Sequence, residues 1–222
     1  MYLKFYKINC HNVSAVLSNS LYAASPLKFN DPFEASCKIE EATQMAKSNI
    51  PHTPENVARY RTRRFVICLT YTCNIKKAIQ NTLMWSHYAD SHKGFCVVYK
   101  DNIAQILQGG ANYVAHQKVN YDPNIPTIQS YNDGYDLTPI FTKSKVWKYE
   151  NEERFVFEIE GLYELGSPSE TIEVIYFGVN TNTLLPCYKE LICFATQNNI
   201  PCYQATLSTL KYKLNFTKIR AT

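Results

Sequence analysis

Apolar runs of strand length recur along this chain and predict most of its sheet. Residues 65–71 and 95–99 are continuous apolar runs, which are typical of buried central strands. Other runs are shorter or contain more polar residues, but their patterns are also typical of strands. They predict further strands at residues 3–8, 21–25, 113–121, 153–159, 172–177, 202–207 and 212–219.

Segments with helical spacing and end signals alternate with these strands. Asp31-Pro32 and Thr53-Pro54 are typical of helix starts, and Gly109-Gly110 is typical of a helix end. The first of these helices would run to about residue 47, and Asp101 would cap the helix that ends at Gly109. Helices are therefore expected at residues 12–18, 32–47, 54 onwards, 80–90, 101–109, 139–147 and 182–197.

The interleaving of helices and strands predicts a mixed α+β fold, with a central mixed or split β-sheet flanked by helices. No internal repeat or break in composition divides the chain, so we expect a single domain over residues 1–222. Residues 122–139 are rich in Pro, Asn, Asp, Ser and Gly and predict a long loop or flap within it.

Composition narrows the class of protein further. The chain is 45% hydrophobic and 19% charged, with 7 Gly and 10 Pro, which excludes low-complexity and collagen-like classes. No apolar run is long enough for a membrane span, and the first residues lack the apolar region of a signal peptide. We therefore expect a soluble, cytoplasmic protein that does not act at a membrane.

The charge and cysteine patterns leave the ligand open. The net charge is +4, and its clearest cluster is Arg59, Arg61, Arg63 and Arg64, which fits a solvated helix end or a phosphate contact. The 8 cysteines fit reduced thiols better than a disulfide framework, because the chain is not a small secreted one. None has the two-residue spacing of a zinc knuckle, so no structural metal is expected.

The segment at residues 29–34 is polar and aromatic. Helix capping explains Asp31, Pro32 and Glu34, which stand at the positions of an N-cap, a first helical residue and a capping partner. Capping does not explain Asn30. Asn30 and Asp31 are therefore candidate ligand-binding residues as well.

A second such segment covers residues 84–95. Trp85 and Tyr88 have the spacing of an ordinary packed helix, and the chain then turns through His92-Lys93-Gly94 into a strand. His92 in such a turn fits either a structural hydrogen bond or a donor to an anionic ligand.

A third segment covers residues 145–157. If it is extended, strand alternation places Glu150, Glu152 and Arg154 on one face and Trp147 and Tyr149 on the other. Two carboxylates beside an Arg fit a general base with its orienting partner. The same pattern also fits an exposed, salt-bridged face.

Together the polar blocks resemble the bacterial family of domains of unknown function numbered 2971. The resemblance extends over nearly the whole chain, although Tyr6-Lys7 stands where members often have a Tyr-Arg-like pair. It depends on Phe29-Asn30-Asp31-Pro32-Phe33-Glu34, on Met84-Trp85-Ser86-His87-Tyr88-Ala89-Asp90, on His92-Lys93-Gly94-Phe95 and on Trp147-x-x-Glu150-x-Glu152-x-Arg154.

Members of this family resemble proteins of mobile-element and phage-defence neighbourhoods, which implies an effector or toxin of that kind. More distantly, the order of the blocks is similar to that of ADP-ribosyltransferases, which implies NAD as substrate. By this resemblance Glu152 is the catalytic carboxylate, Glu150 assists the acceptor, and Arg154 positions carboxylates or phosphates. The acceptor would be a protein, a nucleic acid, a small molecule or water. The implied NAD-binding residues are Tyr6, Lys7, Asn30, Asp31, Trp85, Tyr88 and His92.

Two other functions remain open from the sequence. Asp31, Glu34, Glu150 and Glu152 are carboxylates of the type that hold Mg²⁺ in nucleases and phosphodiesterases. Alternatively, the aromatic and polar surface recognises a nucleotide or a phage protein without catalysis, as a sensor or inhibitor. The P-loop, the nucleophile elbow, the dinucleotide fingerprint and the zincin motif are all missing from the sequence, which gives their enzyme classes no support.

Overall fold

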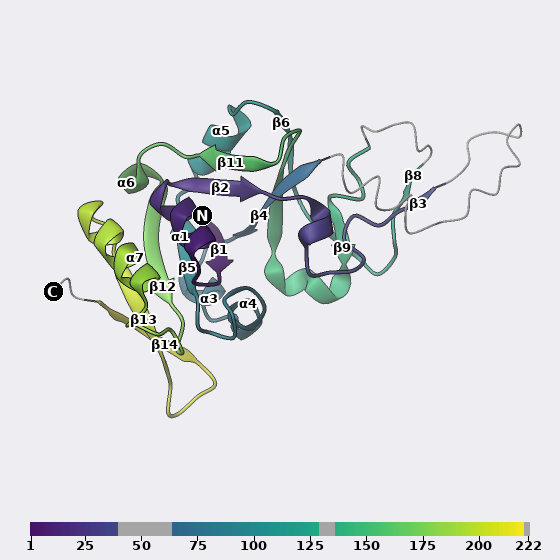
Figure 1. Cartoon of the computed structure of the whole chain (residues 1–222). Helices are drawn as coiled ribbons and strands as arrows, with labels where there is room; N and C mark the ends of the chain where they lie inside the picture. The colour runs from purple at the N-terminus through teal and green to yellow at the C-terminus, as the bar shows by residue number, and fades with distance from the viewer. Residues whose placement is uncertain (40–63, 129–135, 220–222) are drawn as a thin grey trace, which may run out of the picture. The chain divides into compact units, whose positions relative to one another are not determined.

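The computed structural model describes residues 1–39, 64–128 and 136–219, and within them it forms the predicted mixed α+β fold (Figure 1). Eight described strands are hydrogen-bonded in one sheet, in the order β14-β13-β12-β5-β1-β4-β10-β6. The chain divides into two compact units, and one boundary between them in the sequence falls within β4 (Phe65–Tyr71). Unit 1 comprises Met1–Leu21, Leu69–Gly110 and Leu162–Thr222, and unit 2 comprises Tyr22–Cys68 and Ala111–Gly161.

Unit 1 is built around β5 (Phe95–Tyr99), whose five residues are all buried. β5 pairs antiparallel with β1 (Tyr2–Tyr6) on one side and with β12 (Ile172–Phe177) on the other. β12 then pairs parallel with β13, because helix α7 connects the two strands as a crossover. The remaining elements are α1 (Cys10–Leu17), α3 (Ile75–Ala78), α4 (Thr82–Tyr88), α5 (Ile103–Gln108), α6 (Pro168–Thr171), α7 (Pro186–Gln197), β13 (Cys202–Leu207) and β14 (Leu214–Lys218).

Unit 2 contains the other end of the sheet, where β10 (Glu152–Phe157) pairs antiparallel with β6 (Tyr113–Lys118). Its core gathers apolar side chains from segments far apart in the sequence, including Ala35, Val66, Ile140 and Val156. Its other elements are η1 (Pro26–Lys28), β3 (Lys38–Ile39), β7 (Asn120–Asp122), β8 (Thr127–Ile128), β9 (Thr142–Ser144) and η2 (Lys145–Glu150). The pair β2 (Ser20–Ala23) and β11 (Gly161–Glu164) lies where the chain passes between the units.

Two predicted helices are wrong over the described residues. After Asp31 the chain makes consecutive turns, Ala35 adopts a left-handed φ of 53°, and β3 follows, so no helix runs through residues 32–39. Residues 139–147 form a turn, β9 and the start of the 3₁₀ helix η2, because β9 pairs with β7. Asn102 and not Asp101 occupies the N-cap position of α5, and its side chain makes no capping hydrogen bond.

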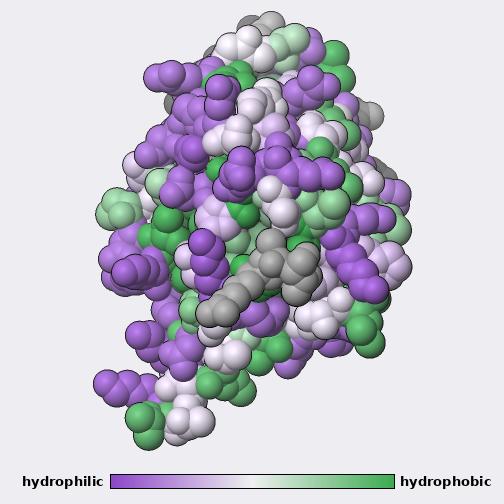
Figure 2. Space-filling model, turned by 90° about the vertical axis from the view of Figure 1, so that its left-hand side faces the viewer, coloured by the Kyte–Doolittle hydropathy of each residue, from purple (hydrophilic) through white to green (hydrophobic). Residues whose placement is uncertain are grey.

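Other predictions fall partly or wholly outside the described ranges. The helix at Thr53-Pro54 and the cluster of Arg59, Arg61 and Arg63 lie there, as does part of the predicted loop at 122–139. The described part of that loop contains the short strand β8. Among the helices in the described ranges, none is long and apolar enough to cross a bilayer. On the face shown in Figure 2, hydrophilic residues predominate and hydrophobic ones form small patches between them.

Candidate functional site

Unit 2 encloses a cluster of five charged side chains, which we call the unit 2 charge cluster. Its members come from four places in the chain, and none is more than 7% exposed. Burial of this many charges is costly unless they are paired, so the cluster is the most unusual chemical feature of unit 2. The five residues are Glu34 before β3, Lys143 on β9, Glu150 at the end of η2, and Glu152 and Arg154 on β10.

Arg154 is fully buried and joins two of the carboxylates. Its Nε and Nη2 atoms donate to Oε1 and Oε2 of Glu152, each at 3.0 Å, which is the bidentate geometry of a strong Arg–carboxylate pair. Its Nη1 donates to Glu34 Oε1 and to the carbonyl oxygen of Ile140, both at 2.5 Å. The guanidinium therefore fixes the orientation of the Glu152 carboxylate.

Lys143 lies among the three carboxylates of the cluster. Its Nζ is 2.5 Å from Glu150 Oε2, 3.4 Å from Glu152 Oε2 and 3.9 Å from Glu34 Oε2. The same ammonium is 5.0 Å from the ring centroid of Trp147, within the range of a cation–π contact. Three carboxylates and two cations give the cluster a formal charge of −1 when all five groups are ionised.

These cations keep Glu152 ionised. Burial alone opposes the charged form, but Arg154 and Lys143 outweigh it and hold the pKa of Glu152 at about 2. Burial has the opposite effect on the pKa of Lys143, which it lowers, but Glu152, Glu150 and Glu34 outweigh burial and raise that pKa. A carboxylate of this kind cannot donate a proton at neutral pH. It can stabilise a positive charge.

The backbone between η2 and β10 explains how Glu150 and Glu152 meet. Asn151 adopts a left-handed conformation with φ 46° and ψ 54°, which ends η2 and starts the strand. The backbone N–H of Glu152 then donates to the hydroxyl of Tyr121 at 2.8 Å. Glu150 thus reaches the cluster from the 3₁₀ helix η2 and not from an extended segment, which was the condition of the sequence argument.

The other predicted residues of unit 2 lie at the turn that follows η1. Asp31 is buried, and its Oδ1 accepts the N–H of Phe33 at 2.9 Å, whereas Asn30 is exposed. Capping was predicted for Asp31 and Glu34. Asp31 makes a local turn, but Glu34 turns inward and binds Arg154 instead of capping a helix.

The five remaining predicted residues belong to unit 1. Trp85 is fully buried, and its indole N–H donates to the carbonyl oxygen of Ile79 at 2.8 Å. The buried hydroxyl of Tyr6 is 3.0 Å from that of Tyr99. Trp85 and Tyr6 thus contribute to the core of unit 1, while Lys7 is exposed and Tyr88 and His92 are half-buried.

His92 has the most unusual surroundings of these five. Asp90, Ser91 and His92 have successive positive φ angles of 49°, 54° and 66°, a run that L-residues rarely adopt. The His92 ring stacks on Trp85, with centroids 6.1 Å apart, and its Nε2 lies 3.4 Å from Ser86 Oγ. Its buried Nδ1 has no hydrogen-bond partner among the described residues, and burial lowers the pKa of the ring.

Several members of the site were not predicted. Lys143 and Tyr121 were not singled out in the sequence, and Cys68, which hydrogen-bonds Glu152, was assigned only to an apolar run. Lys143 was hidden because a helix was predicted around it. In the structure it is a strand residue between Thr142 and Ser144.

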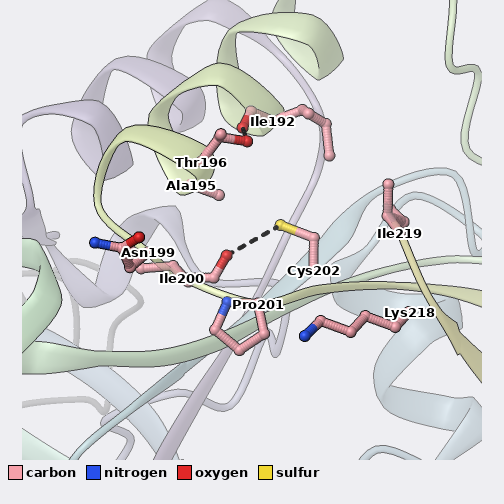
Figure 3. A pocket seen from close by; sticks show the side chains of 9 residues that line it. All are labelled: Ile192, Ala195, Thr196, Asn199, Ile200, Pro201, Cys202, Lys218 and Ile219. Carbon is pink, nitrogen blue, oxygen red and sulfur yellow. Dashed lines mark hydrogen bonds between the residues drawn. The ribbon is translucent and has the colours of Figure 1, made fainter. Parts of the chain in front are cut away.

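A separate cavity of about 730 Å³ opens in unit 1 at the C-terminal end of α7 (Figure 3). Ile192, Ile200 and Ile219 supply apolar walls, and Lys218 and Asn199 supply polar groups. None of the predicted site residues lines it. The Sγ of Cys202 faces the carbonyl oxygen of Ile200 at 4.0 Å within this cavity.

The described carboxylates do not form a ready metal site. No group of three or more His, Cys, Asp or Glu side chains within the described ranges has the arrangement that holds a metal ion. The geometry of the charge cluster gives the reason, because the Lys143 ammonium lies where a cation would bind Glu34, Glu150 and Glu152.

The fold and this site define a mixed α+β protein with a buried carboxylate cluster at one end of its sheet. Residues 84–155 match the family described as "Protein of unknown function (DUF2971)", which confirms the predicted resemblance over this part of the chain. The match includes Trp85, His92, Glu150, Glu152 and Arg154, that is, two of the three polar blocks and most of the charge cluster. No curated protein and no solved structure matches the chain.

Proposed function

We propose that the protein cleaves the glycosidic bond of NAD and transfers the ADP-ribosyl group, with Glu152 as the catalytic carboxylate. The observation that supports this most directly is the carboxylate of Glu152, which is ionised and held in a fixed orientation by Arg154. Loss of nicotinamide develops positive charge on the ribose, and an oriented carboxylate stabilises that charge in the transition state.

The sign of the cluster supports a cationic substrate group. The formal charge of −1 would attract the positively charged nicotinamide ribosyl end of NAD more strongly than its phosphates. Glu150, 2.5 Å from Lys143, would assist the acceptor. Asn30 and Asp31, which belong to unit 2 like the cluster, remain proposed contacts to the rest of the dinucleotide.

The metal-dependent alternative is less well supported by the same geometry. Mg²⁺ prefers carboxylate oxygens and water around it, and here Lys143 neutralises those oxygens. A nuclease of this type would require Lys143 to leave the cluster. The NAD proposal requires only that the neighbouring side chains move enough to expose Glu152, which is 5% exposed.

The test measures NAD consumption by the purified protein and by Glu152→Gln and Glu152→Asp variants. We expect both to lose activity by roughly 100-fold or more, because neither carries a carboxylate at the required position. Glu152→Asp retains a negative charge opposite Arg154, so it tests whether a loss of activity comes from the missing carboxylate position or from unfolding. Glu153→Gln is the matched control, since Glu153 lies on the same strand but pairs with His116.

Three results would contradict the proposal. A folded Glu152→Gln protein that consumes NAD at the wild-type rate would exclude the assignment of Glu152. Degradation of DNA or RNA that stops with EDTA and needs no NAD would favour the nuclease. Tight nucleotide binding without turnover, unaffected by the carboxylate variants, would favour a sensor. If NAD is consumed, labelled protein and nucleic-acid acceptors can be compared by mass spectrometry.

A further inference from the structure

Two cysteines from opposite ends of the sequence meet on unit 1. Cys10 is the first residue of α1, and Cys187 is the second residue of α7. These helices pack against each other (Figure 1), and the two Sγ atoms are 4.0 Å apart although 177 positions separate them. Such proximity needs tertiary structure, because no local pattern brings these two thiols together.

The pair differs from the other cysteines in its accessibility. All eight cysteines are free thiols, and Cys37, Cys96 and Cys202 are buried in the core. Cys10 is exposed and Cys187 is half-buried, so a small oxidant can reach the pair from solvent. Both residues lie in the first turn of a helix.

We propose that Cys10 and Cys187 form a reversible disulfide and that this pair is a redox modification site of the protein. The oxidant is a low-molecular-weight disulfide, RSSR, of the glutathione class. A disulfide bond is about 2.05 Å long, so the sulfurs must approach by roughly 2 Å, a distance that rotation of two surface side chains can supply.

The reaction proceeds by two exchanges. The Cys10 thiolate attacks one sulfur of RSSR, the S–S bond breaks, and RS⁻ leaves with the electron pair. The Cys187 thiolate then attacks Cys10 Sγ in the mixed disulfide and displaces the second RS⁻. In total, two protein thiols lose two electrons and two protons, and RSSR is reduced to two RSH.

The structure also orders the two steps. Cys10 is the more exposed thiol, and burial together with the neighbouring Cys10 raises the pKa of Cys187. The first attack is therefore assigned to Cys10, and Cys187 resolves the mixed disulfide. The product ties α1 to α7, the helix that connects β12 to β13, and so restrains unit 1 across its two distant chain segments.

The test incubates the reduced full chain with oxidised glutathione and maps the products by mass spectrometry without reduction. We expect loss of the mass of two hydrogen atoms and a linked peptide that contains both Cys10 and Cys187. Cys187→Ser should accumulate one glutathione adduct at Cys10, while Cys10→Ser should react several-fold more slowly at Cys187. Cys193→Ser, an exposed cysteine of the same helix, is the matched control and should form the linked peptide normally.

A second measurement compares thermal unfolding before and after oxidation. The cross-link joins residues 177 positions apart and so closes a long loop of the chain. The midpoint of the oxidised wild type should therefore rise by roughly 5–10 °C and return after reduction. The Cys187→Ser protein should show no rise. Separate glutathione adducts on both cysteines, with no linked peptide, would overturn the proposal, as would a preferred bond from Cys10 to Cys193. None of these outcomes depends on NAD turnover.

Discussion

Arg154 holds Glu152 through two parallel N–H···O bonds of 3.0 Å, although the two residues are neighbours on one face of the same strand. Within unit 2 the pair fixes the orientation of the Glu152 carboxylate, and the positive charge of Arg154 balances its negative charge. Because the remaining Arg154 donors bind Glu34 and the Ile140 carbonyl, the pair also ties β10 to two other segments of the chain. The stability of unit 2 and its proposed chemistry therefore depend on the same interaction.

Replacement of Arg154 by Met should destabilise the protein by about 3–5 kcal/mol, because it leaves Glu152 and Glu34 buried without their main partner. Urea unfolding measured by circular dichroism checks this value. Lys148→Met, at an exposed position of η2, is the control and should change the free energy of unfolding by less than about 0.5 kcal/mol. An equal loss in both variants would contradict the role assigned to Arg154.

The free energy of unfolding should depend on pH in the range where Glu152 titrates. Its pKa is about 2 in the folded protein against 4.5 for an unperturbed Glu. A lowered folded-state pKa means that the stabilisation is present above pH 4.5 and is lost as the pH falls from there towards 2. The loss amounts to about 3 kcal/mol. Urea midpoints measured across this range should fall less steeply in Glu152→Gln, and parallel curves for the two proteins would refute the assignment.

Replacement of Lys143 by Met should reverse the pH dependence. Three carboxylates would then share only Arg154, so their mutual repulsion raises the pKa of one of them. A raised folded-state pKa makes the variant gain stability as the pH falls through that value. We expect Lys143→Met to be more stable at pH 5 than at pH 7, with Lys145→Met, an exposed lysine of η2, as the unchanged control. A variant with the wild-type pH profile would show that Lys143 is not coupled to the carboxylates.

Gly178 is expected to tolerate no side chain. A Cβ there would overlap the carbonyl oxygen of His92. That oxygen belongs to the backbone, so it cannot rotate away as a flexible side chain could. Gly178→Ala should therefore destabilise the protein by about 3 kcal/mol. Gly109→Ala at the end of α5 is the matched control, because its Cβ would meet its nearest neighbour at an ordinary 3.4 Å. Thermal unfolding of the two variants separates these cases.

The sequence predicted the positions of those strands whose own residues show a clear pattern. The runs at Phe65–Tyr71, Phe95–Tyr99, Ile172–Phe177 and Cys202–Leu207 are strands with the predicted bounds. The clearest case is Phe95–Tyr99, which is apolar and buried at every position, so its pattern is visible without knowledge of its partners. The pairing of Glu152 with Arg154 was visible for a similar reason, since residues two apart on a strand share a face.

The helix predictions at residues 32–39 and 139–147 failed where long-range pairing overrode local signals. Asp31-Pro32 has the form of a helix start, yet β3 pairs with β8 from a distant segment. In the same way β9 pairs with β7. Hydrogen bonds to another strand satisfy the backbone as fully as a helix does, and a local pattern cannot show that such a partner exists.

By itself, the sequence determined the mixed α+β class, the main strands and the resemblance to the family, and it placed Glu150, Glu152 and Arg154 close together. Only the tertiary structure decided that the chain forms two units from interleaved segments, and that Glu34 and Lys143 complete the charge cluster. It also brought Cys10 to Cys187. The physical reason is the same in each case: these contacts join residues that lie far apart in the chain, and periodicity reports only on neighbours.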